Sequence, residues 1–175
     1  MIETVLPPEL VAAARRVVEA NRAAGRRVAL AESCTGGLVS AALTEIAGSS
    51  DVIEAAFICY SNEAKIAALG VHSDVLETFG AVSVATAWGM AQGALRLSGA
   101  DAAVSITGIA GPDGGTPRKP VGTVVFARAE KGQNSSDVHA VRREFGDLGR
   151  GGVRLQAALC ALELLLPSPP AEPAP

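Results

Sequence analysis

Apolar positions along the chain follow two patterns, one typical of strands and one typical of helices. Short apolar runs predict strands over residues 28–31, 52–60, 102–106, 121–128 and 138–145. Apolar stripes at helical spacing predict helices over residues 9–24, 38–46, 62–69, 74–79, 84–98 and 153–166. Because helices and strands alternate until the last two strands, we expect an α/β protein. Its predicted architecture is a three-layer α/β/α sandwich around a mixed, mostly parallel sheet of about five strands.

Length and composition predict one folded domain and a short tail. The chain has 175 residues, so residues 1–166 are expected to form a single domain. Hydrophobic residues make up 49% and charged residues 19%, which excludes a disordered charged polymer. Residues 167–175 are rich in proline, and we expect them to be disordered or extended.

Charge and the rare residue types exclude several classes of function. The net charge of −3 argues against a nucleic-acid partner, and no apolar run is long enough for a membrane span. The N-terminus lacks a secretory signal, so we expect a cytoplasmic protein. Cys34, Cys59 and Cys160 form no CxxC pair, and His72 and His139 are isolated. We therefore expect no disulfide framework, no metal and no cofactor.

Unusual residues gather at three predicted strand ends, over residues 32–37, 60–65 and 107–115. Ligands of open α/β sheets usually bind beyond the carboxyl ends of the strands. We therefore expect these three segments to meet at one crevice.

The first segment, 31–37, joins a strand to a helix and holds small and hydroxyl residues. The free N–H groups of a helix N-terminus favour an anion, and Ser33 is a candidate nucleophile. The alternative is structural, because Ser and Thr are also preferred helix caps. Cys34 is a second candidate nucleophile, although a small buried thiol is its more usual role.

The second segment supplies a candidate base. Asn62 is a reasonable helix N-cap, which would put Lys65 one turn into the helix. A lysine that is partly buried at a helix N-terminus has a lowered pKa and can act as a general base beside a serine. The alternative is a solvated lysine paired with Glu63. Both histidines are more readily explained as structural residues.

The third segment, 105–115, is rich in glycine and begins directly at a strand end. Its backbone N–H groups could surround a phosphate or a ribose, with Arg118 and Lys119 supplying positive charge. The alternative is an ordinary surface loop.

These segments together resemble the CinA C-terminal domain family, in its stand-alone form. The matching motifs, in the family's order, are AESCTGG (31–37), AGSS (47–50), YSNEAK (60–65), GAVS (80–83), SITGIAGPDGG (105–115) and KPVGTV (119–124). The resemblance implies a nicotinamide-nucleotide amidase of the pyridine-nucleotide cycle. Such an enzyme hydrolyses the carboxamide of nicotinamide mononucleotide to nicotinate mononucleotide and ammonia.

The resemblance also implies roles for individual residues. Ser33 would be the nucleophile, Lys65 the base, and Tyr60 would orient or relay a proton. The substrate would contact the strand-end segments, at Glu32, Cys34, Thr35, Gly36, Gly37, Asn62, Thr107, Gly108, Ala110 and Gly111. Two tasks, stabilising the oxyanion and binding the phosphate, fall to segments 34–37 and 108–111, and the sequence does not show which segment has which task.

Three positions depart from the family pattern and keep other functions open. Val84 and Gly89 stand where the family usually has Glu, and Leu148 stands where it usually has Arg, with Arg150 two residues later. The alternative function is a non-catalytic nucleotide-binding or regulatory protein of the competence- and damage-inducible type. Another is an amidase for a different ribosylated amide. The Ala- and Gly-rich helix over residues 86–97 also suggests a homodimer or larger homo-oligomer.

Overall fold

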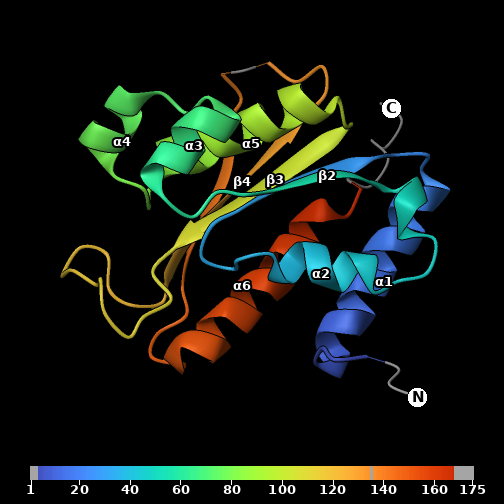
Figure 1. The fold of residues 1–175 in the computed structure, drawn as a ribbon, viewed down its shortest axis with the longest axis horizontal. Coiled ribbons are helices and arrows are strands. Elements are labelled where there is room, and N and C mark those ends of the chain that lie inside the picture. The colour runs from blue at the N-terminus through green and yellow to red at the C-terminus, as the bar shows by residue number, and fades with distance from the viewer. Residues whose placement is uncertain (1–3, 135, 168–175) are drawn as a thin grey trace, which may run out of the picture.

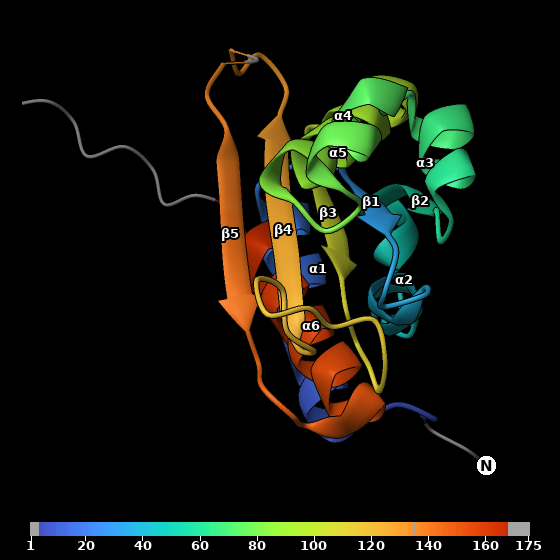
Figure 2. The ribbon, with the colours of Figure 1, turned by 90° about the vertical axis from the view of Figure 1, so that its left-hand side faces the viewer.

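The centre of the computed structural model, which describes residues 4–134 and 136–167, is a mixed sheet with strand order β2-β1-β3-β4-β5 (Figures 1 and 2). β1 pairs in parallel with both β2 and β3, whereas β4 and β5 extend the sheet by antiparallel pairing. The strands are β1 (Val28–Glu32), β2 (Ile53–Ile58), β3 (Ala102–Gly108), β4 (Thr123–Glu130) and β5 (His139–Glu144). The predicted α/β class and mixed sheet are confirmed.

Helices cover both faces of this sheet (Figures 1 and 2). One face carries α1 (Pro8–Ala23), α2 (Leu38–Thr44) and α6 (Gly149–Leu165). The other carries α3 (Asn62–Leu69), α4 (Ser73–Phe79) and α5 (Val84–Ser98). A short 3-10 turn, Ser49–Asp51, leads into β2. None of the described helices is long and apolar enough to cross a membrane.

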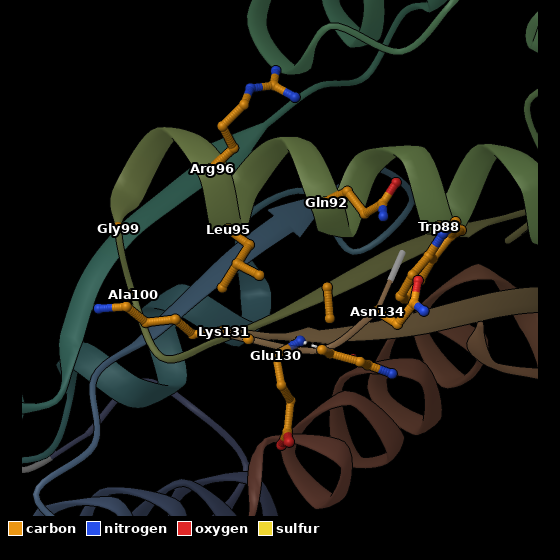
Figure 3. Close-up of a pocket in the computed structure, with 12 residues that line it drawn as sticks. Trp88, Gln92, Leu95, Arg96, Gly99, Ala100, Glu130, Lys131 and Asn134 are labelled. Atoms are coloured by element: carbon orange, nitrogen blue, oxygen red, sulfur yellow. Dashed lines mark hydrogen bonds between the residues drawn. The ribbon is translucent and has the colours of Figure 1, made fainter. Parts of the chain in front are cut away.

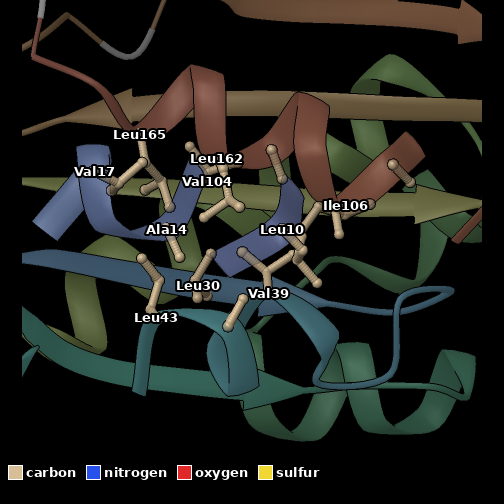
Figure 4. Packing of buried hydrophobic residues seen from close by; sticks show 14 of the residues in the cluster. Leu10, Ala14, Val17, Leu30, Val39, Leu43, Val104, Ile106, Leu162 and Leu165 are labelled. Carbon is tan, nitrogen blue, oxygen red and sulfur yellow. The ribbon is translucent and has the colours of Figure 1, made fainter. Parts of the chain in front are cut away.

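The larger core lies between the sheet and helices α1, α2 and α6 (Figure 4). Leu30 and Val104 of the sheet meet Leu10, Leu43 and Leu162 of the helices there, all fully buried. The amide of the buried Asn21 links α1 to α6 by donating to the backbone oxygen of Leu165 at 3.0 Å. The opposite face buries smaller residues, mainly alanines, so α5 lies close against β3 and β4.

Two boundaries differ from the sequence prediction at the end that holds the candidate site. β4 begins at Thr123 rather than 121, because the preceding residues form a turn in which Thr123 N–H donates to Pro120 O. α6 begins at Gly149 rather than 153, so the glycine-rich stretch forms its first turn despite the low helix propensity of glycine. This start places Arg150 in the first turn of α6. The predicted tail lies almost wholly outside the described residues.

Candidate active site

Ser33 and Lys65, which are 32 positions apart in the sequence, meet beyond the carboxyl ends of β1 and β2. Ser33 directly follows β1, and its backbone N–H donates to Ile106 O of the neighbouring strand at 2.9 Å. Lys65 lies on α3, and its Nζ is 3.1 Å from Ser33 Oγ. The helix is capped by Ser61, whose hydroxyl accepts from Ala64 N–H at 3.0 Å, so the expectation that Asn62 is the N-cap is wrong.

The environment of the Lys65 amine shifts it toward its neutral form, compared with a lysine in water. The side chain is 1% exposed, and this burial lowers its pKa from the ordinary value of 10.5. Nζ donates to the backbone oxygens of Cys59 and Tyr60, both at 3.1 Å. A third backbone oxygen, that of Ser61, lies 3.5 Å from Nζ. In the neutral form of the amine, its two hydrogens can go to the carbonyls of Cys59 and Tyr60, which leaves the lone pair for the Ser33 hydroxyl. The pair therefore has the geometry of a nucleophile and its general base.

Glu32, expected to contact substrate, instead faces the start of α2. Its fully buried carboxylate accepts hydrogen bonds from Gly37 N–H at 3.0 Å, Val39 N–H at 3.2 Å and Ser40 N–H at 2.8 Å. A carboxylate is favourable at a helix N-terminus because it satisfies free N–H groups there. Glu32 thus fixes the loop that carries Ser33. Its location in the sequence, just before a predicted helix, is the signal that could have indicated this role.

The remaining residues of this loop have different environments. Gly36 N–H donates to Ser33 O at 3.0 Å, so the amides of Gly36 and Gly37 both have partners inside the protein. Burial raises the pKa of the Cys34 thiol to about 11, so it is protonated near neutral pH and a poor nucleophile. Thr35 is buried, and within the described residues its hydroxyl has no hydrogen-bond partner. Arg154 of α6 donates to Thr35 O at 2.8 Å.

Tyr60 and Arg150 stand together at the mouth of the site. Arg150 donates to Tyr60 Oη at 2.9 Å and to Gly111 O at 2.8 Å. It therefore joins α6 to both the β2–α3 connection and the loop after β3. In the sequence pattern Arg150 is only a displaced residue with no predicted role. The start of α6 at Gly149 is what turns it toward the site.

A crevice of about 260 Å³ opens above the Ser33–Lys65 pair. Its lining includes Cys34 and Tyr60 together with Thr107, Gly108, Ala110 and Gly111, all expected to be at the site. It also includes Ile109, Asp113 and Gly114 of the predicted segment 107–115. Three further lining residues, Ala81, Val82 and Arg150, were not expected at the site. Glu32, Thr35, Gly36, Gly37 and Asn62 are outside this lining. The three segments predicted to converge therefore contribute to one crevice.

The Thr107 hydroxyl has a structural partner. It donates to Ala81 O at 2.8 Å, and the side chain is almost fully buried. This hydrogen bond holds the α4–α5 connection against the end of β3. Thr107 therefore supports one wall of the crevice.

A larger hollow of about 520 Å³ lies at the opposite end of β3, between α5 and the β4–β5 hairpin (Figure 3). Its lining includes Trp88, Gln92, Arg96 and Lys131 but no Ser, Thr or Cys among the described residues. The nucleophile and base candidates lie elsewhere, so this hollow is less suited to the chemistry than the smaller crevice.

The three departures from the family pattern lie outside the crevice lining. Val84 is exposed at the start of α5, Gly89 packs against Val71, and Leu148 is exposed before α6. His72 caps α4 and His139 lies exposed on β5, so neither histidine is part of the site. Within residues 4–134 and 136–167, no group of three or more His, Cys, Asp or Glu side chains could hold a metal ion.

The fold and site define an α/β sandwich with a Ser–Lys pair at its topological switch. The chain belongs to the CinA C-terminal domain family, whose model matches residues 11–168. It is 48% identical over 158 residues to the nicotinamide-nucleotide amidohydrolase PncC of Escherichia coli K12, covering 90% of this chain and 93% of that protein. It is 47% identical to the competence/damage inducible protein CihA from Agrobacterium tumefaciens. The crystal structure of that protein matches with a TM-score of 0.88, over 93% of this chain and 96% of that one.

Other relatives are much longer than this chain. It spans 35% of a CinA-like protein from Anaeromyxobacter dehalogenans, at 51% identity over 150 residues covering 85% of this chain. It spans 34% of a relative from Symbiobacterium thermophilum.

Proposed function

We propose that this protein hydrolyses the carboxamide of nicotinamide mononucleotide, releasing nicotinate mononucleotide and ammonia. The observation that carries the proposal is the 3.1 Å approach of Lys65 Nζ to Ser33 Oγ at the floor of the crevice. The likeness to relatives named for this activity, over nearly their full length, supports it. The Ser–Lys pair needs no histidine, which agrees with the places of His72 and His139.

The reaction follows from the state of the lysine. Neutral Lys65 takes the hydroxyl proton as Ser33 Oγ attacks the amide carbon, forming a tetrahedral oxyanion. Protonated Lys65 then gives this proton to the leaving nitrogen, and ammonia departs from an acyl-serine. Water attacks the acyl group, Lys65 again accepts a proton, and Ser33 is restored when the acid leaves.

Hydrogen bonds already present within the protein support one division of two tasks, stabilising the oxyanion and binding the phosphate. The amides of Gly36 and Gly37 donate to Ser33 O and to Glu32, so neither is available to a ligand. We assign the oxyanion to the Cys34 amide, next to the nucleophile. We assign the phosphate to Arg150 and the Ala110–Gly111 backbone. The guanidinium there contacts a hydroxyl and a carbonyl, so an anion could replace either partner.

Tyr60 contributes through two atoms in this proposal. Its backbone oxygen accepts from Lys65 Nζ and orients the amine, and its hydroxyl accepts from Arg150 at the mouth. Replacing Tyr60 with Phe keeps the first contact and removes the second. The expected loss is therefore in nucleotide affinity rather than in the chemical step.

The decisive experiment measures ammonia release from nicotinamide mononucleotide by the wild-type protein and by Ser33→Ala and Lys65→Ala. Both variants are expected to lose at least about 1000-fold in kcat, as for removal of a catalytic dyad member. Lys131→Gln, on the distant β4–β5 connection, is the matched lysine control and should keep full activity. Hydroxylamine should divert the acyl-serine to a hydroxamate. Wild-type turnover that survives in Ser33→Ala would contradict the proposal.

A second experiment tests the phosphate assignment. Arg150→Gln should raise KM for nicotinamide mononucleotide about tenfold or more, since a hydrogen bond to a charged group is worth roughly 1.5–3 kcal/mol. The same variant should leave KM for nicotinamide riboside, which lacks the phosphate, nearly unchanged. An equal rise in both KM values would refute the assignment.

A further inference from the structure

Lys119 connects two segments that both line the crevice, residues 81–82 and the loop after β3. Its Nζ donates to Phe79 O at 2.9 Å, and Phe79 is the last residue of α4. The last carbonyls of a helix lack partners within the helix and carry partial negative charge, so an ammonium group is favourable there. No salt bridge involving Lys119 is formed within the described part of the chain. This carbonyl is therefore its principal partner.

The first wall follows immediately after this contact. Gly80 is the C-cap of α4, and the next two residues, Ala81 and Val82, line the crevice. Thr107 holds this wall at its other side by donating to Ala81 O. The wall is thus fixed between the sheet and the Lys119 side chain.

The second wall is the glycine-rich loop after β3. Thr116 and Lys119 exchange backbone hydrogen bonds of 2.8 and 3.1 Å, so the backbone of Lys119 is held in a hydrogen-bonded turn. Val121 lies behind the part of the loop that faces the crevice. A Cβ placed on Gly111 would come within 2.6 Å of a Val121 methyl group, so that position needs glycine. Through this close packing, the anchored residues 116–121 hold residues 109–114 in place.

We propose that Lys119 is a positioning residue, which sets the width of the crevice by tying the loop after β3 to the end of α4. Its effect on kinetics rests on the proposed amidase function. Ser33 and Lys65 come from β1 and α3, so loosening the loop leaves the nucleophile and base in place. Loss of Lys119 therefore weakens nucleotide binding and spares the chemical step.

The test compares Lys119→Gln and Lys119→Arg with Lys131→Gln, which removes an exposed lysine from the β4–β5 connection. Hydrogen exchange of the free protein needs no substrate, and Lys119→Gln should speed exchange of the hydrogen-bonded amides of Ile109, Thr116 and Gly122, which flank and anchor the loop, about tenfold. In steady-state kinetics the same variant should raise KM for nicotinamide mononucleotide about fivefold, with kcat unchanged within about twofold. Lys119→Arg keeps a cationic donor and should restore most of both properties. Lys131→Gln should match the wild type.

The outcomes separate this proposal from the proposed function. Faster exchange confined to the loop together with a raised KM supports the positioning role. Unchanged exchange in Lys119→Gln, or a KM equal to that of the wild type, overturns it. So does a parallel fall in kcat and melting temperature, which indicates a general structural role. If the wild type does not hydrolyse the nucleotide, the proposed function fails, and the exchange result alone decides whether Lys119 holds the loop.

Discussion

Two glycines of α5 offer a direct test of how packing between helices positions Lys65. A Cβ on Gly93 would lie 2.9 Å from the carbonyl carbon of Leu69, 3.0 Å from its Cβ, and closer still to its oxygen. A Cβ on Gly89 would meet only Val71 methyl groups, at 3.6 Å. Carbon atoms pack best at roughly 3.5–4.0 Å, so Gly89 has room for a methyl group and Gly93 has none.

The comparison isolates the packing cost from helix propensity. Both positions lie inside α5, and each Gly→Ala change gains about 1 kcal/mol of intrinsic helix stability. Gly93→Ala adds an overpacking cost of about 1–3 kcal/mol, because the neighbouring atoms are backbone and cannot rotate away. With a central difference of about 2 kcal/mol, Gly93→Ala should melt roughly 4–8 °C below Gly89→Ala. Thermal and urea unfolding, followed by circular dichroism, measure this difference.

The same clash reaches the active site through α3. Leu69 lies one turn after Lys65, so moving the end of α3 away from α5 shifts the amine relative to Ser33. A displacement of about 1 Å can reduce a catalytic rate about 100-fold, so Gly93→Ala should lose activity as well as stability. Gly89→Ala should keep normal ammonia release. If Gly93→Ala is as stable and active as Gly89→Ala, the close approach of α3 to α5 described here is wrong.

Three further predictions concern the residues around the nucleophile. Glu32→Gln should lower the free energy of unfolding by about 1–2 kcal/mol, because the charge-assisted hydrogen bonds from the start of α2 are weakened. Thermal unfolding measures this loss, and an unchanged melting temperature would argue against the capping role of Glu32. Cys34→Ala should keep kcat within about threefold, because a thiol with a pKa of about 11 is not the nucleophile, and loss of turnover in that variant would reverse this interpretation. The lowered pKa of Lys65 predicts that kcat/KM rises with pH through an apparent pKa below 10.5. The free energy of unfolding should rise with pH between the pKa of Lys65 in the folded protein and 10.5, because in that range the unfolded chain binds one proton more than the folded chain. The Lys65→Met variant should lack this dependence on pH.

The sequence was sufficient to bring together the candidate pair, Ser33 and Lys65. Ser33 and Lys65 each follow an apolar run that predicts a strand, and the carboxyl ends of parallel strands lie at the same edge of a sheet. The apolar pattern and the expected sheet topology together predict that these two residues lie close to each other. The exact cap of α3 was not decided by pattern, since Ser61 and Asn62 are adjacent residues of good capping type.

Side-chain direction was harder to predict than location. The family resemblance places Glu32 among the substrate contacts, yet its carboxylate points to the start of α2 and is outside the crevice lining. Arg150 was missed for a different reason. Its glycine-rich surroundings indicate a loop by propensity, and only packing of α6 against the sheet extends the helix back to Gly149. In both cases the deciding information is three-dimensional.

In the proposed mechanism Lys65 must be deprotonated, and the contacts of Glu32 with α2 help to keep it so. A carboxylate beside a lysine raises its pKa and keeps it protonated, which would remove the lone pair that the Ser33 hydroxyl needs. Glu32 is buried one residue from Ser33, but its charge is stabilised by three backbone N–H groups of the α2 end. Lys65 is surrounded by carbonyl oxygens and the serine hydroxyl, and burial lowers its pKa more strongly than the nearby charges raise it. The capping of α2 thus does two things at once: it fixes the nucleophile loop, and it keeps a buried carboxylate from pairing with the base.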